Sequence, residues 1–230
     1  AKNSIYNALY QVLNMLFPLI SSVYVARTLM PDGVGRVAYA QNIASYFATA
    51  AALGIPTVGL RVISVAREER KELDKAFSEL TILNAISTTV SLAFYVVLIF
   101  LNPAFRSDYR LFLITGLTVA FNYINIEWLY KGNEEYVYIV VRSLIIKIAS
   151  LVALFIFVRS KDDYIIYALI TSLALCGNYV FNAWRAHRYA SFTLSELNIK
   201  RHIKPVMLLA GAIFFSTIYS KLDTTMLGIM

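Results

Sequence analysis

The sequence has almost no cysteine or histidine, and this scarcity removes several classes of site at once. Cys176 is the only cysteine, so no internal disulfide can form and no cysteine-based metal site exists. The two histidines, His187 and His202, both lie in a polar stretch, and a zinc site would need more ligands than they supply. We therefore expect neither a bound metal nor a cofactor.

Charged residues are scarce as well. They make up 15% of the 230 residues, whereas hydrophobic residues make up 59%, and the mean hydropathy is +0.63. Soluble domains average about 25% charged and about 45–50% apolar residues, so this composition indicates a protein that lies in a lipid bilayer. The net charge of +7 lies mostly in short loops between apolar segments. Membrane topology explains that pattern, and we expect no nucleic-acid partner.

What the sequence has in abundance is long apolar runs. Each has about the ~20 residues that are needed to cross a hydrocarbon core, and such segments must be helical because an open strand edge would leave backbone groups unpaired in lipid. The sequence therefore predicts an all-α, polytopic transmembrane helix bundle with about seven spans. The predicted spans are residues 5–29, 37–63, 77–101, 109–130, 137–158, 164–184 and 206–230.

Proline and glycine indicate where these helices are interrupted. Pro18 and the run Gly54-Ile55-Pro56 each predict a kink or break. Residues 31–36 predict a polar turn between the first two spans. Broken helices often border the substrate site of a transporter, although a static kink explains the same residues equally well.

The distribution of Lys and Arg predicts the orientation. With the N-terminus placed in the cytoplasm, eleven of the 21 cations fall on the cytoplasmic side and five on the opposite side. The positive-inside rule favours this arrangement, which makes the protein a multi-pass protein of a bacterial or archaeal plasma membrane with a cytoplasmic N-terminus. The cytoplasmic cations are Lys2, Arg67, Arg70, Lys71, Lys75, Lys131, Arg185, Arg188, Lys200, Arg201 and Lys204, and the outer ones are Arg36, Arg106, Arg110, Arg159 and Lys161.

Polar side chains recur every three or four residues on several predicted spans, so each set lines one face of its helix. The stripe of the first span includes Asn7, Gln11 and Asn14, and that of the sixth includes Asn178. Such residues can simply join helices, at about 0.6 kcal/mol per interaction. Because stripes occur on several spans, we interpret them as the lining of one water-filled cavity.

Three ionisable residues lie deep within predicted spans, namely Lys147, Lys221 and Asp223. A charge at the bilayer centre costs at least about 2.5–3.5 kcal/mol, so it normally faces protein or water and marks a pathway. A structural ion pair with a neighbouring helix is the alternative. Other charged residues lie nearer the span ends, where long side chains can reach the headgroups, and these are Arg27, Arg61, Glu79 and Glu127.

Three sequence stretches carry a resemblance to a known family. The first contains Leu29-Met30-Pro31 and Leu53-Gly54-Ile55-Pro56 with Arg61, the second is Asn125-Ile126-Glu127-Trp128-Leu129-Tyr130-Lys131-Gly132, and the third is Leu222-Asp223-Thr224-Thr225-Met226-Leu227-Gly228. Together, and in this order, they resemble the polysaccharide and O-antigen flippase family, the Wzx type, of the multidrug/oligosaccharidyl-lipid/polysaccharide exporter superfamily.

The resemblance implies an architecture of two six-helix lobes around a central cavity. Residues 1–188 would then form the N-terminal six-helix lobe, residues 189–205 a basic cytoplasmic linker, and residues 206–230 the first helix of the second lobe. The chain opens with Ala1 and ends at Met230 inside an apolar segment, so we expect it to be a portion of a longer protein.

The resemblance also implies a substrate, undecaprenyl-diphosphate-linked oligosaccharide, which the family moves to the outer leaflet by alternating access. Arg61, Lys147 and Arg27 would form a ladder of cations for the diphosphate, with Lys221 as a further cation. Asn7, Gln11, Asn14 and Asn178 would bind sugar hydroxyls. Asp223 or Glu127 would carry a coupling ion. Membrane lipids, a polysaccharide polymerase and a chain-length regulator are the implied partners.

Other functions fit parts of the sequence. A multidrug or cation antiporter of the same superfamily would favour buried carboxylates, whereas two of the three central charges are lysines. A membrane glycan polymerase or transferase would need an acid/base or metal cluster at a membrane face, and the Asp162-Asp163 pair has no accompanying histidine or nucleophile. A scaffold subunit would not need polar helix faces. The sequence therefore favours a flippase that is not an enzyme.

Overall fold

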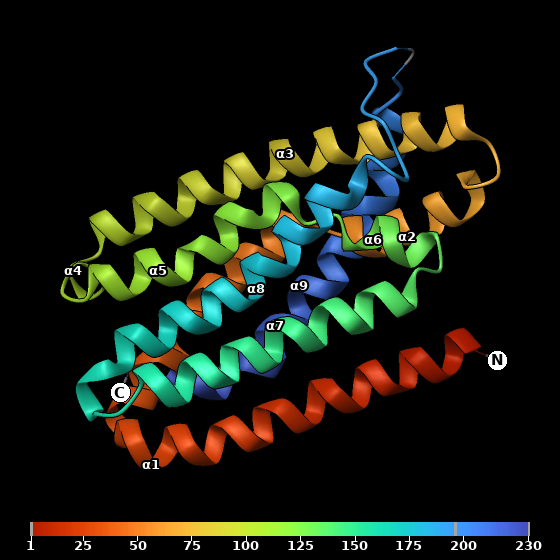
Figure 1. Cartoon of the computed structure of the whole chain (residues 1–230). Helices are drawn as coiled ribbons and strands as arrows, with labels where there is room; N and C mark the ends of the chain where they lie inside the picture. Colours follow the sequence, from red (N-terminus) through yellow and green to blue (C-terminus); the bar gives the residue numbers. More distant parts are fainter. Residues whose placement is uncertain (1, 196, 230) are drawn as a thin grey trace.

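The computed structural model describes the backbone of residues 2–195 and 197–229; the side chains of residues 1–11, 13, 14, 16–18, 104, 196, 224 and 227–230 are not described. Every regular element in the described part is helical, so the predicted all-α bundle is confirmed (Figure 1). The elements are α1 (Lys2–Ala52), α2 (Ile55–Ala66), α3 (Arg70–Leu101), α4 (Pro103–Arg106), α5 (Tyr109–Ala120), η1 (Phe121–Ile124), α6 (Glu127–Gly132), α7 (Tyr136–Phe157), η2 (Lys161–Asp163), α8 (Tyr164–Ala186) and α9 (Lys200–Ile229).

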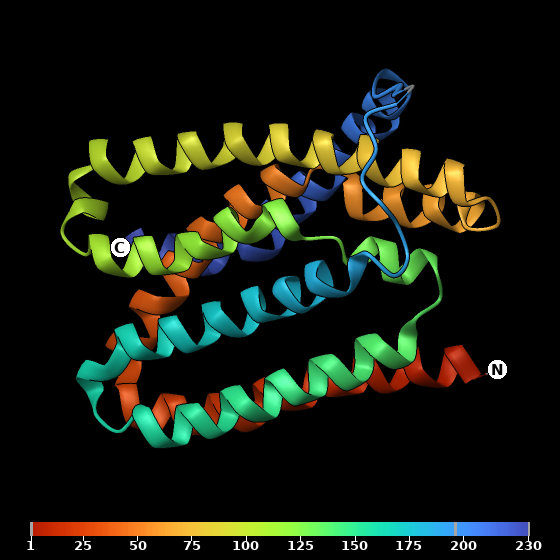
Figure 2. The ribbon, with the colours of Figure 1, turned by 45° about the horizontal axis from the view of Figure 1, so that its top comes forward.

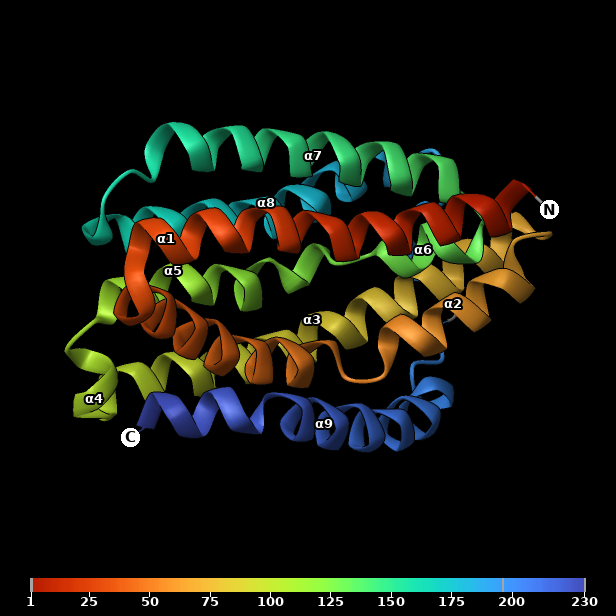
Figure 3. The same cartoon turned by 90° about the horizontal axis from the view of Figure 1, so that it is seen from below.

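Five helical stretches of the described chain are long and apolar enough to cross a membrane, and Tyr109–Ile124 is a shorter apolar helix. Helix α1, to which most of the first stretch belongs, folds back on itself, and its two halves run along the bundle in opposite directions (Figure 3). The fourth predicted span is shorter than expected: it ends at Ile124, and the short helix α6 follows beyond it. The chain is a multi-pass membrane protein.

The reversal inside α1 occurs at Met30, whose φ of 60° and ψ of 169° are not helical. The predicted turn over residues 31–36 is therefore wrong: helix resumes directly after Met30, and Pro31 suits a first helical position because it has no N–H to satisfy. Gly33 lies in a crowded place, since a Cβ there would be 3.2 Å from the Leu29 Cβ. We refer to residues 2–29 as the first arm of α1 and to residues 31–52 as the second arm.

The predicted break at Gly54-Ile55-Pro56 is confirmed. The second arm ends at Ala52, Leu53 takes a positive φ of 49°, and α2 begins at Ile55 with proline in its first turn. Helix α9 packs into this break so closely that a Cβ on Gly54 would lie 2.6 Å from the Val206 carbonyl oxygen. Only glycine therefore allows α9 to contact the backbone at this point.

The connections lie at two ends of the bundle (Figures 1 and 2). One end, which we call the N-terminal end, holds the start of α1, the α2–α3 turn, α6, and the segment between α8 and α9. The other end, which we call the kink end, holds Met30, α4 and the α7–α8 connection with η2. The first arm and helices α3, α7, α8 and α9 each run between the two ends, whereas the second arm reaches the N-terminal end only together with α2, because the α1–α2 break lies part-way along the bundle (Figure 3).

Two main apolar clusters hold the bundle together. Near the N-terminal end, Trp128 and Tyr130 of α6 pack with Ile63 of α2 and Leu80 of α3. In the second cluster, small residues of the second arm such as Ala40 and Ala44 let α3 and α5 approach closely. Helix α9 lies along the outside of the second arm and α2 (Figure 3).

Candidate functional site

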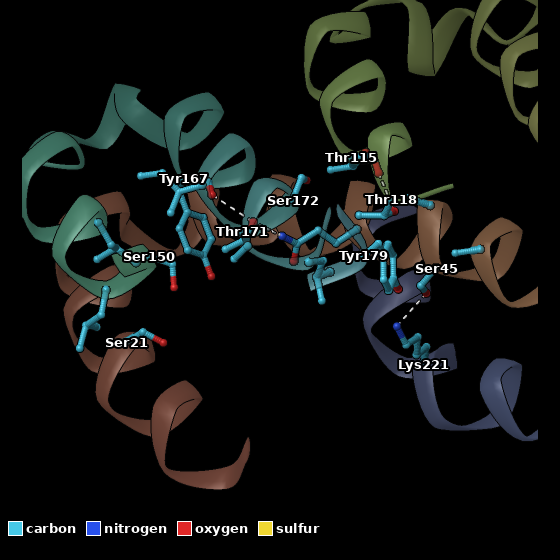
Figure 4. A pocket seen from close by; sticks show the side chains of 18 residues that line it. Ser21, Ser45, Thr115, Thr118, Ser150, Tyr167, Thr171, Ser172, Tyr179 and Lys221 are labelled. Carbon is cyan, nitrogen blue, oxygen red and sulfur yellow. Dashed lines mark hydrogen bonds between the residues drawn. The ribbon is translucent and has the colours of Figure 1, made fainter. Parts of the chain in front are cut away.

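A cavity of about 440 Å³ lies in the interior of the bundle, between the two arms of α1 and helices α5, α7, α8 and α9 (Figure 4). We call it the central cavity. Its volume falls in the range of about 300–1,000 Å³ that is usual for small-molecule sites. Its polar lining residues carry hydroxyl, amide or ammonium groups, and these residues are Ser21, Gln41, Ser45, Thr115, Thr118, Ser150, Tyr167, Thr171, Ser172, Tyr179 and Lys221.

Two hydrogen bonds join helices across this cavity. Gln41 of the second arm donates to the Thr171 hydroxyl of α8 over 2.8 Å. Lys221 of α9 donates to the Ser45 hydroxyl of the second arm over 2.7 Å (Figure 4). Gln41 and Ser45 are four residues apart, so they share one face of the second arm. That arm therefore contributes polar groups to the cavity along more than one helical turn.

Among the described residues that line the central cavity, Lys221 carries the one formal charge. The remaining polar groups are neutral donors and acceptors that can serve a ligand's hydroxyl groups. In a partly dry site, one ammonium attracts an anionic group far more strongly than it would in water. The cavity is thus suited to a ligand that is mostly neutral and hydroxylated with an anionic group at one place.

A second hollow, of about 1010 Å³, opens at the N-terminal end between α2, the start of α3 and the start of α9. We call it the end groove. It has an apolar wall that includes Val62, Val65 and Leu209, and its charged lining includes Arg61, which is exposed. Its charged and titratable residues are Arg61, Glu68, Glu69, Glu72, Arg201 and His202. The groove is therefore both acidic and basic, unlike the central cavity.

The structure does not bring the predicted cation ladder together in one place. Arg61 lines the end groove and Lys221 lines the central cavity. Arg27 is exposed near the kink end, and Lys147 is partly buried on α7, and neither of them is among the lining residues of these two hollows. The four predicted cations thus lie in four different places, and only Arg61 and Lys221 line one of the two hollows.

Asn178 does not line either hollow but holds a buried arginine. Its side-chain oxygen accepts from the Arg142 Nε over 3.0 Å, and Arg142 also donates to the Asn182 side-chain oxygen. Arg142 completes its contacts with an ion pair to Glu127 at 2.9 Å. Because Asn178 is already engaged in this way, the contacts favour a structural role for it.

Glu127 occupies the centre of that ion-pair network. It contacts Lys131 at 2.8 Å as well as Arg142 at 2.9 Å. Burial would raise the pKa of the Glu127 carboxyl, but the positive charges of Lys131 and Arg142 outweigh burial and hold the pKa below its ordinary value. A carboxylate in this setting stays ionised near neutral pH, which disfavours it as a carrier of a coupling proton.

The other predicted site residues lie elsewhere or outside the described residues. Asp223 is exposed on α9. The side chains of Asn7, Gln11 and Asn14 lie outside the described residues, so the proposed sugar contacts of the first arm stay predictions.

Sequence reasoning missed several residues that the structure places in or near the sites. Gln41 and Ser45 in the second predicted span and Thr115 and Thr118 in the fourth line the central cavity. Their three- and four-residue spacing was a usable signal. Glu79 was interpreted as a snorkelling side chain, but it is completely buried. Its partners lie more than 100 residues away in the sequence, and no local pattern reveals them.

Comparison with known proteins identifies the family of this chain. The model of the family described as "Polysaccharide biosynthesis protein" matches residues 1–230, the whole chain. The chain belongs to this family. This confirms the relationship that the three sequence stretches indicated.

Two curated relatives are similar to the chain. A protein named "Putative O-antigen transporter" from Escherichia coli (strain K12) is 25% identical over 205 residues, covering 88% of this chain and 49% of the relative. A protein of the same name from Shigella dysenteriae is 26% identical over 193 residues, covering 83% of this chain and 48% of the relative. The chain thus spans about half the length of these relatives. No solved structure matches it.

Proposed function

We propose that this chain forms part of a flippase that moves undecaprenyl-diphosphate-linked oligosaccharide across the plasma membrane by alternating access. Family membership and two relatives named as O-antigen transporters support transport of a polysaccharide precursor. The proposal extends this to the lipid-linked form of the substrate, because the polar glycan of such a lipid cannot cross the apolar core of the bilayer unless a protein supplies hydrogen-bond partners. A polysaccharide polymerase and a chain-length regulator remain the partners that we predict for it.

The observation that carries the proposal is the chemistry of the central cavity. Its described lining offers many hydroxyl groups and an amide inside a membrane-spanning bundle, which suits sugar hydroxyls. Its one charge is the Lys221 ammonium, which can act as a point charge for phosphate. The apolar lipid tail would stay in the surrounding bilayer.

Among the cations that line the two hollows, Lys221 is the strongest candidate for the diphosphate. The end groove holds Arg61 and Arg201, but it also holds three glutamates, which repel an anion. The lining of the central cavity has no carboxylate among its described residues, so the field of Lys221 is not cancelled there. We assign Arg61 to the entry of the headgroup and Lys221 to its binding within the bundle.

The chemical groups that line the central cavity also distinguish a flippase from the alternative functions. An antiporter for cationic drugs would be served by carboxylates in the cavity, whereas the lining residues supply hydroxyl groups and an ammonium. A glycan polymerase or transferase needs an acid/base pair or metal ligands at the site. The flippase therefore accounts for the lining residues better than either alternative.

The proposal is tested by replacing Lys221 in the full-length protein and measuring surface glycan in a flippase-deficient strain. We expect Lys221→Ala to reduce surface glycan by about 10-fold or more, since an interaction with a charged group contributes about 1.5–3 kcal/mol, and Lys221→Arg to retain part of the activity. Arg27→Ala is the matched control, because Arg27 is exposed and lines neither hollow. Equal expression of all variants is checked by immunoblotting. Surface glycan at the wild-type level from Lys221→Ala would overturn the assignment.

A further inference from the structure

Glu79 is a carboxylate with no exposed surface, located on α3 near the N-terminal end of the bundle. Its oxygen Oε2 accepts from the Arg201 Nε over 2.8 Å and lies 2.7 Å from the His202 Nε2. His202 is itself buried, with 5% of its surface exposed. A buried carboxylate on one helix thus meets a guanidinium and an imidazole at the start of another helix, α9.

The contact between Glu79 and His202 must contain a proton. An imidazole nitrogen and a carboxylate oxygen at 2.7 Å repel each other unless one of them carries hydrogen. With one proton in this contact, the neutral imidazole, the carboxylate and the Arg201 guanidinium sum to zero charge. A further proton would leave a net positive charge in a buried place, which is costly.

The same part of α3 also fixes the segment that leads into α9. The Asp74 carboxylate accepts a hydrogen bond from the backbone N–H of Ser191 over 2.7 Å. The Ser78 hydroxyl accepts one from the backbone N–H of Thr193 over 2.8 Å. The Glu79 carboxylate accepts one from the backbone N–H of Asn198 over 2.6 Å. Asp74, Ser78 and Glu79 lie within six residues of α3, so this stretch of the helix holds the connection at three points. The contact of Glu79 with Arg201 and His202, which we call the joint, is the last of these attachments before α9 continues.

Pro205 makes the first turn of α9 separable from the rest of the helix. Proline has no N–H, so it cannot donate to the carbonyl four residues earlier, and it weakens the helix at this point. Residues 200–204 precede this proline, and they include both α9 residues of the joint. The turn can therefore change position without unfolding the remainder of α9.

The joint also lies where the walls of the end groove meet. Glu72 and Ala76 of α3 line one side of the groove, and Arg201 and His202 of α9 line another. Any movement of the first turn of α9 away from α3 therefore changes the width of the groove. Water in the groove is the source from which the joint can take a proton.

We propose that Glu79 and His202 form a proton-operated latch between α3 and the first turn of α9. With a single proton in their contact the turn is docked on α3. A second proton, taken up from water in the end groove, releases the turn so that its positive charge becomes hydrated, and the groove widens. The imidazole suits this role because histidine ordinarily changes charge between about pH 5 and pH 8. That a wider groove admits the substrate rests on the proposed function, whereas the movement of the first turn of α9 does not.

Other charged groups surround the joint and must be separated from it experimentally. Arg61 of α2 and the glutamates of the α2–α3 turn face the same groove. The charged groups near the joint, in addition to Glu79 and His202, are Arg61, Glu68, Glu69, Glu72, Asp74 and Arg201.

The test measures the distance between α3 and α9 as the pH changes. Spin labels are attached at Lys71→Cys and Lys204→Cys, which are exposed positions, in the full-length protein with Cys176→Ala, reconstituted in lipid vesicles. Pulsed electron paramagnetic resonance then gives the distance distribution. We expect the distribution to shift to longer distances between about pH 8 and about pH 5, the range in which histidine titrates.

Three variants make the test specific to the latch. His202→Gln can still donate to Glu79 but cannot titrate, so its distance should stay short at both pH values. Glu79→Gln leaves Arg201 without its counter-charge, so the longer distance should already be present at high pH. Glu72→Gln, in the same groove, should respond to pH like the wild type.

The proposal is overturned if the wild-type distance does not change with pH, if His202→Gln still responds, or if Glu72→Gln abolishes the response. These measurements use no substrate, so their failure is distinguishable from a failure of the Lys221 test. A flippase without a latch would lose surface glycan on Lys221→Ala and show a constant α3–α9 distance. A latch on a protein with a different substrate would show the reverse.

Discussion

Glu79 and Arg142, which are buried in the described part of the chain, share one property, which is that another helix supplies the counter-charge. Glu79 of α3 is paired from α9, and Arg142 of α7 is paired with Glu127 of α6 and held by two asparagines of α8. Removing one partner of such a pair leaves the other as an uncompensated buried charge, and that loss costs more than the net contribution of the intact pair. These side chains therefore tie specific helices together.

Arg142 gives a direct test of this property. We expect Arg142→Met to lower the free energy of unfolding by about 3–5 kcal/mol, because Glu127 and the Asn178 and Asn182 oxygens lose their donor. The double variant Arg142→Met/Glu127→Gln should recover part of that loss, since the Glu127 carboxylate, although it keeps Lys131, has lost the more deeply buried of its two cationic partners. Denaturant unfolding in detergent micelles measures both values.

Exposed Arg27 is the control for the Arg142 variants, and its replacement by Met should change stability by no more than about 0.5 kcal/mol. If the double variant is no more stable than Arg142→Met alone, the ion pair with Glu127 is not the reason that Arg142 matters.

At the level of the helices, the breaks determine which elements can approach one another. The α1–α2 break exposes Gly54 to the backbone of α9. The reversal at Met30 makes the two arms of α1 run in opposite directions (Figure 3), and residues of both arms line the central cavity. Met30 adopts a backbone conformation that is nearly restricted to glycine and costs about 1–3 kcal/mol. The surrounding packing must offset that cost, and Leu29 beside it is buried in the small cluster that also contains Val25, Leu154 and Val158.

Replacing Gly54 should loosen the attachment of α9. A Cβ at this position would lie 2.6 Å from the Val206 oxygen and 2.8 Å from the Leu209 Cβ, so α9 must move outwards. We expect Gly54→Ala to lower the free energy of unfolding by about 1–3 kcal/mol, as overpacking does. The midpoint of thermal unfolding in detergent provides the measurement.

Gly35→Ala is the matched control for Gly54→Ala. It lies within a helix, its φ is not positive, and a Cβ there would meet nothing within 4 Å. It should therefore raise stability by about 0.4–1 kcal/mol. Equal unfolding midpoints for the two alanine variants would contradict the close approach of α9 to the break.

At the level of the whole molecule, the sequence predicted the spans well because hydropathy reports how much apolar length is available to cross a bilayer. It predicted the break at Gly54 but misplaced the reversal, since a single positive φ at Met30 leaves no compositional signal. The fourth span was made too long because Trp128 and Tyr130 are apolar, although they serve the core near the N-terminal end instead of facing lipid.

The candidate site was less predictable than the fold. Sequence position gives the depth of a charge in the membrane but not its direction around the helix or its partner. This explains why Lys221 lines the central cavity while Lys147, which also lies within a candidate span, is not among its lining residues. It also explains Glu79, whose partners Arg201 and His202 lie 122 and 123 residues away. Only the packing of α9 on α3 brings these groups together.

The orientation of the molecule depends on the unequal charge of its two ends. Lys71 is exposed at the N-terminal end and Lys161 is exposed at the kink end. We propose that the N-terminal end faces the cytoplasm, because anionic lipids and the positive-inside rule favour the more basic side there. This orientation places the end groove, with Arg61 and the Glu79–His202 latch, on the side where a newly made lipid-linked glycan would enter.

A single cysteine at either lysine tests this orientation in the full-length protein carrying Cys176→Ala. We expect a membrane-impermeant maleimide to label Lys161→Cys in intact spheroplasts, and to label Lys71→Cys only after the membrane is permeabilised. Both positions are exposed, and each change removes one lysine, so each variant alters the charge asymmetry by one charge, Lys71→Cys decreasing it and Lys161→Cys increasing it. The opposite labelling pattern would place the end groove outside the cell, and the entry role that we assign to Arg61 would then pass to the kink end.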